Sequence, residues 1–467
     1  MPRTTHYSSF LDYIININIL CYSNITNKSY MIKKINIIIG LGITGVSCIN
    51  FFLKKGIIPY LMDINPTPIY IKKIPKFIPC CFGSYNIQWI KNAKLIVISP
   101  GISIFHPMLT LAKKLGIPII GDIELFCLNT TTPIIAITGT NGKSTVIDIL
   151  KKIIHKYKYN IGIGGNIGYP ALDLLNISRD FYILELSSFQ LETIKSLKAY
   201  IAMILNITED HLDRYPLGFQ QYRNFKLQIY NNANICIYNN SDKYTYPRTF
   251  FKDTKYVTFG SKNCYYKLYI NNNNIFLKIN NKTILNFKYT KLIGIHNYIN
   301  VLAVLCLTDQ LNIPHNHVLN IIKNYTNNPH TLQIINTSNG ITWINDSKST
   351  NVGSTKAALK YLYNKKKIWL LLGGYDKNCQ LHLLKNYINK DNIIIYCFGT
   401  ASNVIKSLYP KAIKVNSMKE ALQQIHLLVK YGDIVLLSPA CSSIDQFKNF
   451  KHRGKEFINI VKKLTTQ

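Results

Sequence analysis

The sequence predicts an α/β fold of three domains, in which largely parallel sheets are covered by helices. The chain has 467 residues, 47% of them hydrophobic and 16% charged, so it can bury substantial cores and has the length of about three domains. Short β-branched runs bounded by Gly, Pro or Asp alternate with helical stretches, which is typical of parallel sheets. The clearest predicted strands are Ile35–Ile39, Leu95–Ser99, Ile134–Thr138, Tyr182–Leu186, Ile201–Asn206, Ile368–Leu372, Ile393–Phe398 and Ile434–Ser438.

Residues 1–30 precede the first convincing strand, which opens near Met31. They combine a polar start with an Asn-rich Ile run and carry no small-residue cleavage site, so they make a poor signal peptide. We treat them as an extension of unknown role. The uncharged stretch Asn36–Leu53 is long enough to suggest a membrane span, but its glycines favour a buried strand and turn. We therefore expect no membrane partner.

The first domain, residues 31–122, carries the glycine-rich turn Gly40-Leu-Gly-Ile-Thr-Gly45 directly after a strand, and Asp63 ends the next strand. This pattern predicts a Rossmann-like unit. One interpretation is a dinucleotide site with Asp63 on a ribose, which would make the protein a nicotinamide-binding oxidoreductase. A single G-x-G-x-x-G turn is not specific, so this function remains an alternative.

The second domain, residues 123–327, carries a phosphate-binding loop near its start. Strand Ile134–Thr138 runs into Gly139-Thr-Asn-Gly-Lys-Ser-Thr145, and a helix is expected over Val146–Tyr157. Loop N–H groups and the helix N-terminus can hold a polyphosphate, Lys143 can neutralise its charge, and the Ser144 hydroxyl can ligate magnesium. The motif predicts an ATPase-like parallel sheet, although its G-x-x-G-K-S spacing is shorter than that of the general phosphate loop.

Two further motifs follow strands of this second domain. Glu185 stands at a strand end, where a carboxylate can hold a hard cation. His211 comes directly after another strand, at the edge where parallel α/β sheets bind ligands. Between Asn231 and Thr290, short Asn-rich strands predict a small antiparallel excursion, with Asn271–Asn274 as a hairpin tip.

The third domain, residues 328–467, is expected to be Rossmann-like and to end with a helix over about Glu456 to Leu464. This domain contains three polar segments that are candidates for ligand binding. They are Ile344-Asn-Asp-Ser-Lys-Ser-Thr350, Gly373-Gly-Tyr-Asp-Lys377 and Leu437-Ser-Pro-Ala-Cys-Ser-Ser443, the last continuing to Phe450.

The formal net charge of +33 would ordinarily suggest a nucleic acid or an anionic surface as partner. Lys, Asn, Ile and Tyr are abundant while Arg is scarce, and AT-rich codons alone would produce this bias. The lysines are spread along the chain, so we expect no nucleic-acid partner, and a basic DNA-binding protein remains the alternative. The eleven cysteines show no metal-ligand spacing and no disulfide framework, which favours a reducing cytoplasm.

Taken together, the motifs from about Met31 to Leu464 resemble the Mur ligase family, the ATP-dependent amide-bond-forming enzymes of peptidoglycan synthesis and cell-wall biogenesis. The short phosphate-loop spacing is typical of these ligases and of the related folylpolyglutamate synthases. The runs Gln220–Lys226 and Leu292–Asn300 are similar to family signatures, as is the segment around Asp346. The segment Leu437–Phe450 resembles the form found in the D-glutamate-adding members.

The resemblance implies ATP, two Mg²⁺ ions and a carbamylated lysine as cofactors, and UDP-N-acetylmuramoyl-L-alanine and D-glutamate as substrates. It implies transfer of the γ-phosphoryl group to the substrate carboxylate, followed by attack of the D-glutamate amine on the acyl phosphate. We also expect the protein to be a cytoplasmic monomer that contributes to cell shape and cell division.

Matching positions supply the site residues that the resemblance implies. The catalytic residues are Lys143, His211 and Lys226. The ATP-binding residues are Gly139, Thr140, Asn141, Gly142, Lys143, Ser144, Thr145, Asn300 and Asp346. The substrate-binding residues are Ile43, Thr44, Gly101, Asn166, His211, Lys348, Thr350, Lys377, Ser443 and Phe450. The metal ligands are Ser144, Glu185, His211 and Lys226 as its carbamate.

Two positions depart from the family pattern. After Asp63 the family often carries Thr-Arg, whereas this chain has Ile64-Asn65, so the packing of uracil must differ. After His330 the usual Arg is Thr331, which removes a cation expected near the transferred phosphate and predicts slower catalysis unless a nearby lysine substitutes. A sister ligase with another acceptor amino acid and a degenerate, inactive ligase are the remaining alternatives.

Overall fold

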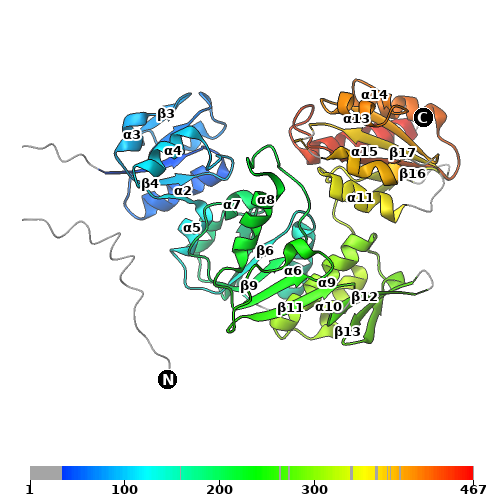
Figure 1. Ribbon diagram of the computed structural model, residues 1–467, viewed down its shortest axis with the longest axis horizontal. Coiled ribbons are helices and arrows are strands. Elements are labelled where there is room, and N and C mark those ends of the chain that lie inside the picture. Colours follow the sequence, from blue (N-terminus) through cyan, green and yellow to red (C-terminus); the bar gives the residue numbers. More distant parts are fainter. Residues whose placement is uncertain are drawn as a thin grey trace, which may run out of the picture.

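The structure is a computed structural model that describes residues 34–465, apart from 158, 262–263, 272–273, 337–339, 363–366, 376, 379 and 389–390. The predicted extension, residues 1–30, and Met31, near which the first strand was expected to open, lie outside the described residues. The described chain forms three sheets, each covered by helices, in the order blue, cyan to green, and yellow to red in Figure 1. This confirms the predicted α/β fold class.

The N-terminal sheet is parallel throughout and has the strand order β3-β2-β1-β4-β5. Its strands are β1 (Ile35–Ile39), β2 (Tyr60–Asp63), β3 (Cys80–Phe82), β4 (Ala93–Ile98) and β5 (Ile119–Gly121). Its helices are α2 (Ile43–Lys54), α3 (Ile87–Lys91) and α4 (Pro107–Lys114). The glycine-rich turn joins β1 to α2, as the sequence predicts, and the first strand has its predicted bounds.

The central sheet has nine strands in the order β14-β13-β12-β11-β10-β9-β6-β8-β7. The strands are β6 (Ile134–Thr138), β7 (Ile161–Gly165), β8 (Phe181–Glu185), β9 (Ala199–Ile204), β10 (Ile235–Asn239), β11 (Lys255–Gly260), β12 (Tyr266–Asn271), β13 (Asn274–Ile279) and β14 (Lys282–Asn286). The helices are α5 (Asp122–Cys127), α6 (Lys143–His155), α7 (Ser188–Leu191), α8 (Gly218–Leu227), α9 (Ile295–Gln310) and α10 (His315–Asn324). All five residues of β6 are buried, as expected for a strand between two parallel neighbours.

The excursion between Asn231 and Thr290 is only partly antiparallel, which corrects the prediction. Strands β10 and β11 pair in parallel and extend the main sheet beyond β9. Only β12, β13 and β14 pair antiparallel, and Asn271 faces Asn274 across the predicted hairpin, whose tip at 272–273 lies outside the described residues. Asn-rich composition signalled turns, but it carried no information on which neighbour each strand would choose.

The C-terminal sheet has the order β15-β16-β20-β17-β18-β19, with β15 alone antiparallel to its neighbour among the described strands. The strands are β15 (Gln333–Asn336), β16 (Thr342–Asn345), β17 (Ile368–Gly373), β18 (Ile393–Phe398), β19 (Ile413–Lys414) and β20 (Ile434–Ala440). The helices are α11 (Val352–Tyr361), α12 (Lys385–Ile388), α13 (Ser402–Leu408), α14 (Met418–Leu428) and α15 (Phe450–Thr465). The last helix begins at Phe450, earlier than the predicted Glu456.

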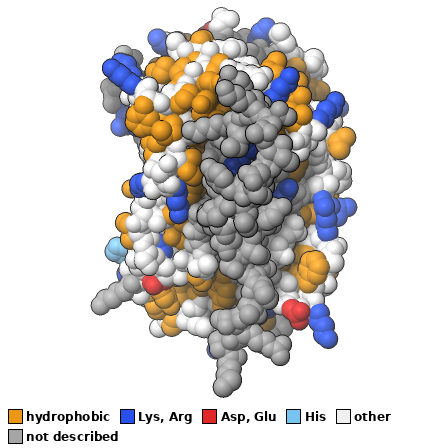
Figure 2. Space-filling model, turned by 90° about the vertical axis from the view of Figure 1, so that its left-hand side faces the viewer, with side chains coloured by type: hydrophobic (Ala, Val, Ile, Leu, Met, Phe, Trp, Pro, Cys, Tyr) orange, Lys and Arg blue, Asp and Glu red, His pale blue; other side chains and the backbone are white. Residues whose placement is uncertain are grey.

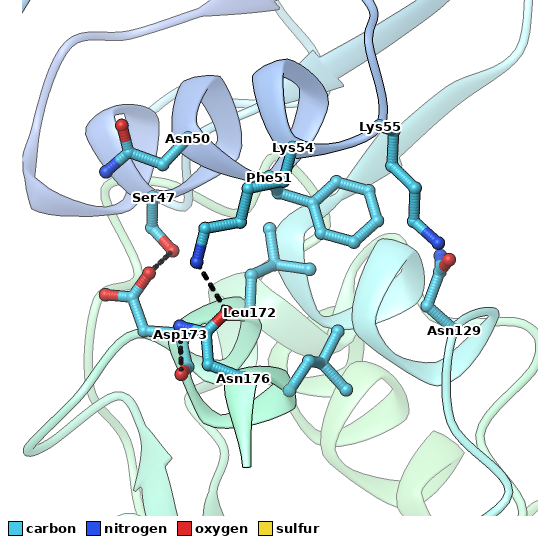
Figure 3. Close-up of a pocket in the computed structure, with 10 residues that line it drawn as sticks. Ser47, Asn50, Phe51, Lys54, Lys55, Asn129, Leu172, Asp173 and Asn176 are labelled. Atoms are coloured by element: carbon cyan, nitrogen blue, oxygen red, sulfur yellow. Dashed lines mark hydrogen bonds between the residues drawn. The ribbon is translucent and has the colours of Figure 1, made fainter.

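The N-terminal and central sheets share one apolar core. Side chains of the first sheet, such as Val97, belong to the same buried cluster as Ala136 and Leu184 of the central sheet. Beside this core, Ser47 Oγ of α2 donates to Asp173 at 2.6 Å, next to a cavity of about 190 Å³ between the two domains (Figure 3). The C-terminal domain differs, because both of its described apolar clusters contain only residues from 332 onward.

Basic side chains are scattered over the surface. Figure 2 views the left-hand side of Figure 1 and shows blue lysine and arginine side chains separated by white and orange ones, with few red acids among them. On the visible, described part of this face the basic side chains are thus dispersed. In the described part of the chain, no helix combines the length and apolarity needed to cross a bilayer.

Candidate active site

The phosphate-binding loop leaves β6 and turns directly into α6. Gly139 and Gly142 have φ values of 154° and 88°, which favour glycine. A Cβ on Gly142 would collide with the carboxamide of Asn300 from α9, so Asn300 lies directly against the loop. Lys143 Nζ donates to the carbonyls of Gly139 at 2.6 Å and Thr140 at 3.0 Å. Helix α6 begins at Lys143 and not at the predicted Val146, so its first N–H groups border the loop.

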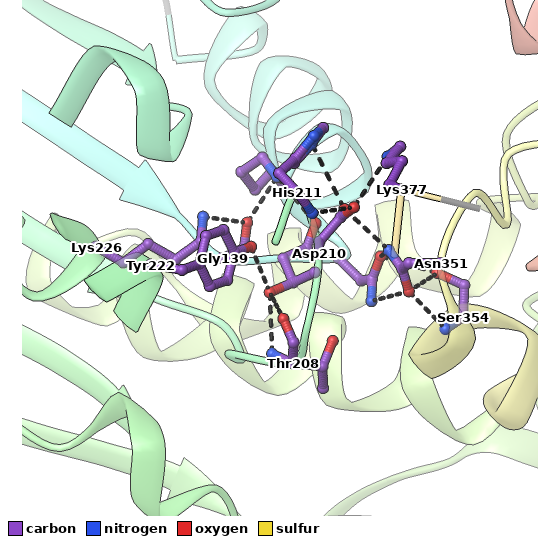
Figure 4. Close-up of polar contacts among 12 residues, drawn as sticks. Gly139, Thr208, Asp210, His211, Tyr222, Lys226, Asn351, Ser354 and Lys377 are labelled. Atoms are coloured by element: carbon purple, nitrogen blue, oxygen red, sulfur yellow. Dashed lines mark hydrogen bonds and ion pairs between the residues drawn. The ribbon is translucent and has the colours of Figure 1, made fainter. Parts of the chain in front are cut away.

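Lys226 of α8 is buried beneath this loop, 2% exposed. Its Nζ donates to Thr138 Oγ1 at 3.3 Å and to the Gly139 carbonyl at 3.1 Å, and it lies 4.9 Å from the centre of the Tyr222 ring (Figure 4). Burial, together with the charge of Lys143, holds the pKa of Lys226 well below its usual range. The amine is therefore poised to lose its proton, and a neutral amine is the form that can react with carbon dioxide.

Glu185 ends β8 with a carboxylate that is only partly satisfied. Its Oε1 accepts from Asn166 Nδ2 at 2.9 Å, while its buried Oε2 has no hydrogen-bond partner among the described residues. Nearby, Lys348 Nζ of the C-terminal domain donates to Ser144 Oγ. Burial is the main reason that the pKa of Lys348 is lowered, and the charge of Glu185 partly opposes it. The unpaired carboxylate oxygen and the hydroxyl are the kinds of ligand that a hard cation takes.

His211 has a left-handed backbone, φ 54°, and its ring packs edge-on against Phe189 at 4.8 Å. Burial lowers the pKa of His211 to about 4, although Asp210 opposes this. The imidazole is therefore neutral at neutral pH, which is the state that can ligate a metal. Asp210, which the sequence analysis left out, pairs with Lys377 Nζ at 2.9 Å across the domain interface. Its place beside His211 in an acidic run was the signal for it.

The predicted metal ligands come together without forming a conventional cluster. Among the described residues, no group of three or more His, Cys, Asp or Glu side chains is arranged to hold an ion. The predicted set has only Glu185 and His211 of these types, and a hydroxyl and a modified lysine would supply the rest. The orphaned Glu185 oxygen and the buried Lys226 amine fit that arrangement.

The segment after β16 lines the C-terminal side of the interface. Asp346 accepts from Leu332 N, Ser349 Oγ and Ser438 Oγ, and burial raises its pKa to about 6. Protein donors therefore already engage this carboxylate, which was predicted to bind the ATP ribose. Thr350 N donates to the Lys348 carbonyl at 2.9 Å, so these two predicted residues share one tight turn.

Ser443 and Phe450 frame the start of α15. Ser443 is 2% exposed, and the Phe450 carbonyl accepts from Ser347 Oγ at 2.9 Å. Arg453, on the same helix, is fully buried and donates to Ser347 Oγ and to carbonyls of Ser347, Cys441 and Ser442. It ties together the two segments that are predicted to bind substrate. The sequence analysis missed this role, although a rare arginine in a lysine-rich chain was an available signal.

The predicted residues of the N-terminal turn lie apart from the loop. Ile43 is 57% exposed at the start of α2, next to Thr44, and Gly101 follows β4. Asp63 accepts from Leu41 N at 2.6 Å and Asn65 N at 2.9 Å, so its carboxylate caps the turn.

Arg214 brings the Gly101 segment to the central domain. Its guanidinium donates to the Gly101 and Ile102 carbonyls while it pairs with Glu192 at 2.8 Å. Sequence reasoning did not single out this arginine. The two departures from the family pattern lie in different surroundings. Ile64 is 55% exposed at the surface, whereas the buried Thr331 Oγ1 has no hydrogen-bond partner among the described residues.

Comparison with protein families matches three models along the chain. Residues 34–121 match the Mur ligase MurD-like N-terminal domain, residues 137–308 the Mur ligase middle domain, and residues 332–441 the Mur ligase glutamate ligase domain.

Curated relatives match nearly the whole chain. The UDP-N-acetylmuramoylalanine–D-glutamate ligase of Buchnera aphidicola subsp. Acyrthosiphon pisum (strain Tuc7) is 49% identical over 94% of this chain and 99% of its own length. The enzyme of the same name from Escherichia coli (strain K12) is 47% identical over 92% of this chain and 98% of its own length.

Solved structures share the fold. UDP-N-acetylmuramate-alanine ligase MurC from Thermotoga maritima is similar with a TM-score of 0.57 and 18% identity, covering 92% of this chain and 99% of that one. MurF ligase from Thermotoga maritima in complex with ADP is similar with a TM-score of 0.59 and 14% identity, covering 93% of this chain and 98% of that one.

Proposed function

The chain belongs to the Mur ligase family, and we propose that the residues gathered between its central and C-terminal domains join D-glutamate to UDP-N-acetylmuramoyl-L-alanine through an acyl phosphate. The protein is an ATP-dependent ligase that forms amide bonds in peptidoglycan precursor synthesis. The observation that carries the proposed site is the burial of Lys226 directly beneath the phosphate-binding loop.

The proposed reaction has two steps. A carboxylate oxygen of UDP-N-acetylmuramoyl-L-alanine attacks the γ-phosphorus of ATP, the bond to ADP breaks, and an acyl phosphate forms. The nitrogen of D-glutamate then attacks the acyl carbon, a proton leaves the nitrogen, and inorganic phosphate departs. Lys143 and the loop N–H groups of Gly139–Thr145 hold the phosphates and neutralise charge that grows during transfer. Asn300 and Asp346 support the nucleotide.

The loop's surroundings fit the two proposed magnesium ions. Ser144 and Glu185 would hold one ion, and His211 with carbamylated Lys226 would hold the other. When bound, the ions would neutralise negative charge on the transferring phosphoryl group. The unpaired Glu185 Oε2, the neutral His211 ring and the depressed pKa of Lys226 support this assignment.

The substrates would enter from opposite sides. Ile43, Thr44 and Gly101 would contact the nucleotide part of UDP-N-acetylmuramoyl-L-alanine, with Asn166 and His211 reaching it from the central domain. Five residues of the C-terminal domain would bind D-glutamate: Lys348, Thr350, Lys377, Ser443 and Phe450. The lysines suit its carboxylates, because each places an amine donor in a largely buried position at the domain interface.

We further propose domain limits at 31–122, 123–327 and 328–467, with a hinge near residues 325–330. A cytoplasmic monomer that takes part in cell division and cell shape, with neither nucleic acid nor membrane as partner, completes the proposal. The spread of lysines along the chain, and their dispersal over the visible part of the face in Figure 2, favour the proposal without nucleic acid.

Phosphate release tests the proposal. Wild type with ATP, UDP-N-acetylmuramoyl-L-alanine and D-glutamate should release phosphate, and omission of D-glutamate should abolish turnover. Lys226→Ala should lose about 10²–10³-fold in kcat, because an electrostatic support of the transferring group disappears. Short carboxylates added to the variant should restore activity by replacing the carbamate.

Lys252→Ala, an exposed lysine of the same domain, is the matched control and should behave as wild type. Full activity of Lys226→Ala without added carboxylates would contradict the carbamate role, and an inactive wild type would contradict the ligase proposal. L-glutamate, L-alanine and diaminopimelate as acceptors test for a sister ligase.

A further inference from the structure

Asn351, which no part of the proposed site uses, joins the C-terminal domain to the phosphate-binding loop. It is the N-cap of α11, where its Oδ1 accepts from Ser354 N at 3.0 Å. Its Nδ2 donates to Asn141 Oδ1 at 3.0 Å, and Asn141 Nδ2 donates back to Asn351 Oδ1 at 3.3 Å. Ser354 Oγ donates to the same Asn141 oxygen at 2.9 Å. The two amides therefore form a reciprocal pair across the domain interface.

Asn141 is anchored so that its side chain is free for this pairing. Its backbone N donates to Asn206 Oδ1 at 2.9 Å, and Asn206 Nδ2 donates to its carbonyl at 2.9 Å. Both bonds lie within the central domain and hold the loop's main chain. Among the described residues, the hydrogen bonds of the Asn141 side chain go to Asn351 and Ser354 of the C-terminal domain. The Asn141 main chain thus fixes the shape of the loop, and the Asn141 side chain makes the contact with the C-terminal domain.

The surrounding packing requires a close approach. A Cβ on Gly353 would lie 2.9 Å from Thr208 Oγ1, so the start of α11 comes against the loop that leads to Asp210. Asn351 Nδ2 also reaches Asp210 Oδ2 at 3.4 Å, and Asn351 is 2% exposed (Figure 4). The described apolar clusters of the C-terminal domain begin at residue 332 and include no central-domain side chain, so these polar contacts join the two domains outside any shared apolar core.

We propose that Asn351 is a positioning residue for ligation, which closes the C-terminal domain on the phosphate-binding loop through its amide pair with Asn141. This inference rests on the proposed function, because it concerns how the D-glutamate-binding lysines reach the nucleotide. In the closed arrangement, Lys348 on the same segment lies at Ser144 and Lys377 at Asp210. Loss of the pair should leave nucleotide binding to the central domain intact and should lower the fraction of enzyme in which these lysines are in place.

The decisive variant is Asn351→Ser. Serine can still cap a helix, as Ser417 does for α14, but it is too short to reach Asn141. We expect kcat to fall about 10- to 100-fold, as for the loss of a few buried hydrogen bonds, with nucleotide affinity within about twofold of wild type. Asn206→Ala should do the opposite and weaken nucleotide binding, because it releases the loop backbone. Asn86→Ser, the same change at the N-cap of α3, is the matched control for stability and should keep activity.

A double-mutant cycle with Asn141→Ala separates pairing from independent damage. The double variant should lose no more turnover than the worse single variant, and solution scattering should show the same increase in radius of gyration for all three. Additive losses, or wild-type turnover and compactness in Asn351→Ser, would overturn the inference. An inactive wild type that still expands on Asn351→Ser would overturn the proposed function and leave the contact standing.

Discussion

Two buried acids in the first turn of α5 have opposite environments. Asp122 Oδ1 has no hydrogen-bond partner among the described residues, and its Oδ2 accepts a long hydrogen bond from Gln190 Nε2 at 3.5 Å, while the backbone N–H groups of the first turn stabilise the carboxylate weakly. Burial raises the pKa of Asp122 to about 6. Glu124 instead accepts from Lys195 N at 2.8 Å, Ser196 N at 2.9 Å and Ser196 Oγ at 2.7 Å. The Asp122 carboxylate is thus poorly hydrogen-bonded, whereas both oxygens of the Glu124 carboxylate accept hydrogen bonds.

Asp122→Asn should therefore stabilise the protein at neutral pH by about 1–3 kcal/mol. The folded pKa of Asp122 is raised, so below about pH 4 both states are protonated and the substitution gains nothing. As pH rises from about 4 to 6 the unfolded state ionises first, folding stability falls in wild type, and the advantage of the variant grows to a plateau. Denaturant midpoints at pH 4, 5 and 7.5 measure it.

Glu124→Gln is the comparison, because it removes a carboxylate that three donors already satisfy. It should lower the denaturation midpoint at pH 7.5, since hydrogen bonds to a charged acceptor contribute about 1.5–3 kcal/mol. Equal effects of the two substitutions would show that hydrogen bonding does not distinguish these acids.

At the scale of elements, the three glycines at the junction of β1 and α2 are not equivalent, and Gly42 and Gly45 differ most clearly. A Cβ on Gly45 would collide with the Gly40 carbonyl, so helix and strand approach too closely for any side chain there. A Cβ on Gly42, with φ −84°, would meet nothing within 4 Å. Of the two, only Gly45 is required by packing.

Gly45→Ala should destabilise the N-terminal domain by about 1–3 kcal/mol and raise KM for the UDP-linked substrate, because α2 must move away from β1 and carries Ile43 and Thr44 with it. Gly42→Ala is the control and should leave both quantities close to wild type. Thermal unfolding and steady-state kinetics measure the two effects. A similar KM for both variants would mean that the turn does not position the substrate.

At the scale of the whole molecule, the two domain interfaces differ in kind. The N-terminal and central domains share an apolar core, whereas the C-terminal domain meets the central one through polar contacts such as Lys377 with Asp210 and Gln380 with Glu209. Apolar burial resists separation over a large area, while a few polar contacts can be exchanged for water. We therefore expect the C-terminal domain to be the part that moves.

Asp210→Asn should favour the open arrangement, because it removes the charge that pairs with the largely buried Lys377. The buried Tyr325 lies at the proposed hinge, so cleavage after it by a protease specific for aromatic residues should become faster. Asp253→Asn, which changes an exposed acid of the central domain, is the control. Unchanged cleavage in Asp210→Asn would show that this ion pair does not hold the domains together.

The sequence by itself determined the fold class, the phosphate-binding loop and the family. These depend on local patterns: β-branched runs make strands, and the Gly139–Thr145 motif must turn between a strand and a helix. Helix ends were less predictable: α15 begins at Phe450, where the Asn449 side chain accepts from His452 N at 3.0 Å, and this cap was not identified from the sequence. The pairing of β10 and β11 likewise depended on β9, which no local pattern records.

Only the tertiary structure decided which polar side chains contact one another. Asp210 and Asn351 lie far apart in the sequence, yet they meet at the loop, and Arg453 acquires its role only because two segments bring their carbonyls to it. The depressed pKa of Lys226 has the same origin, because burial beneath the loop, and not the identity of its neighbours in the chain, sets the cost of its charge. Chemistry of this kind depends on distance in space, which sequence order does not contain.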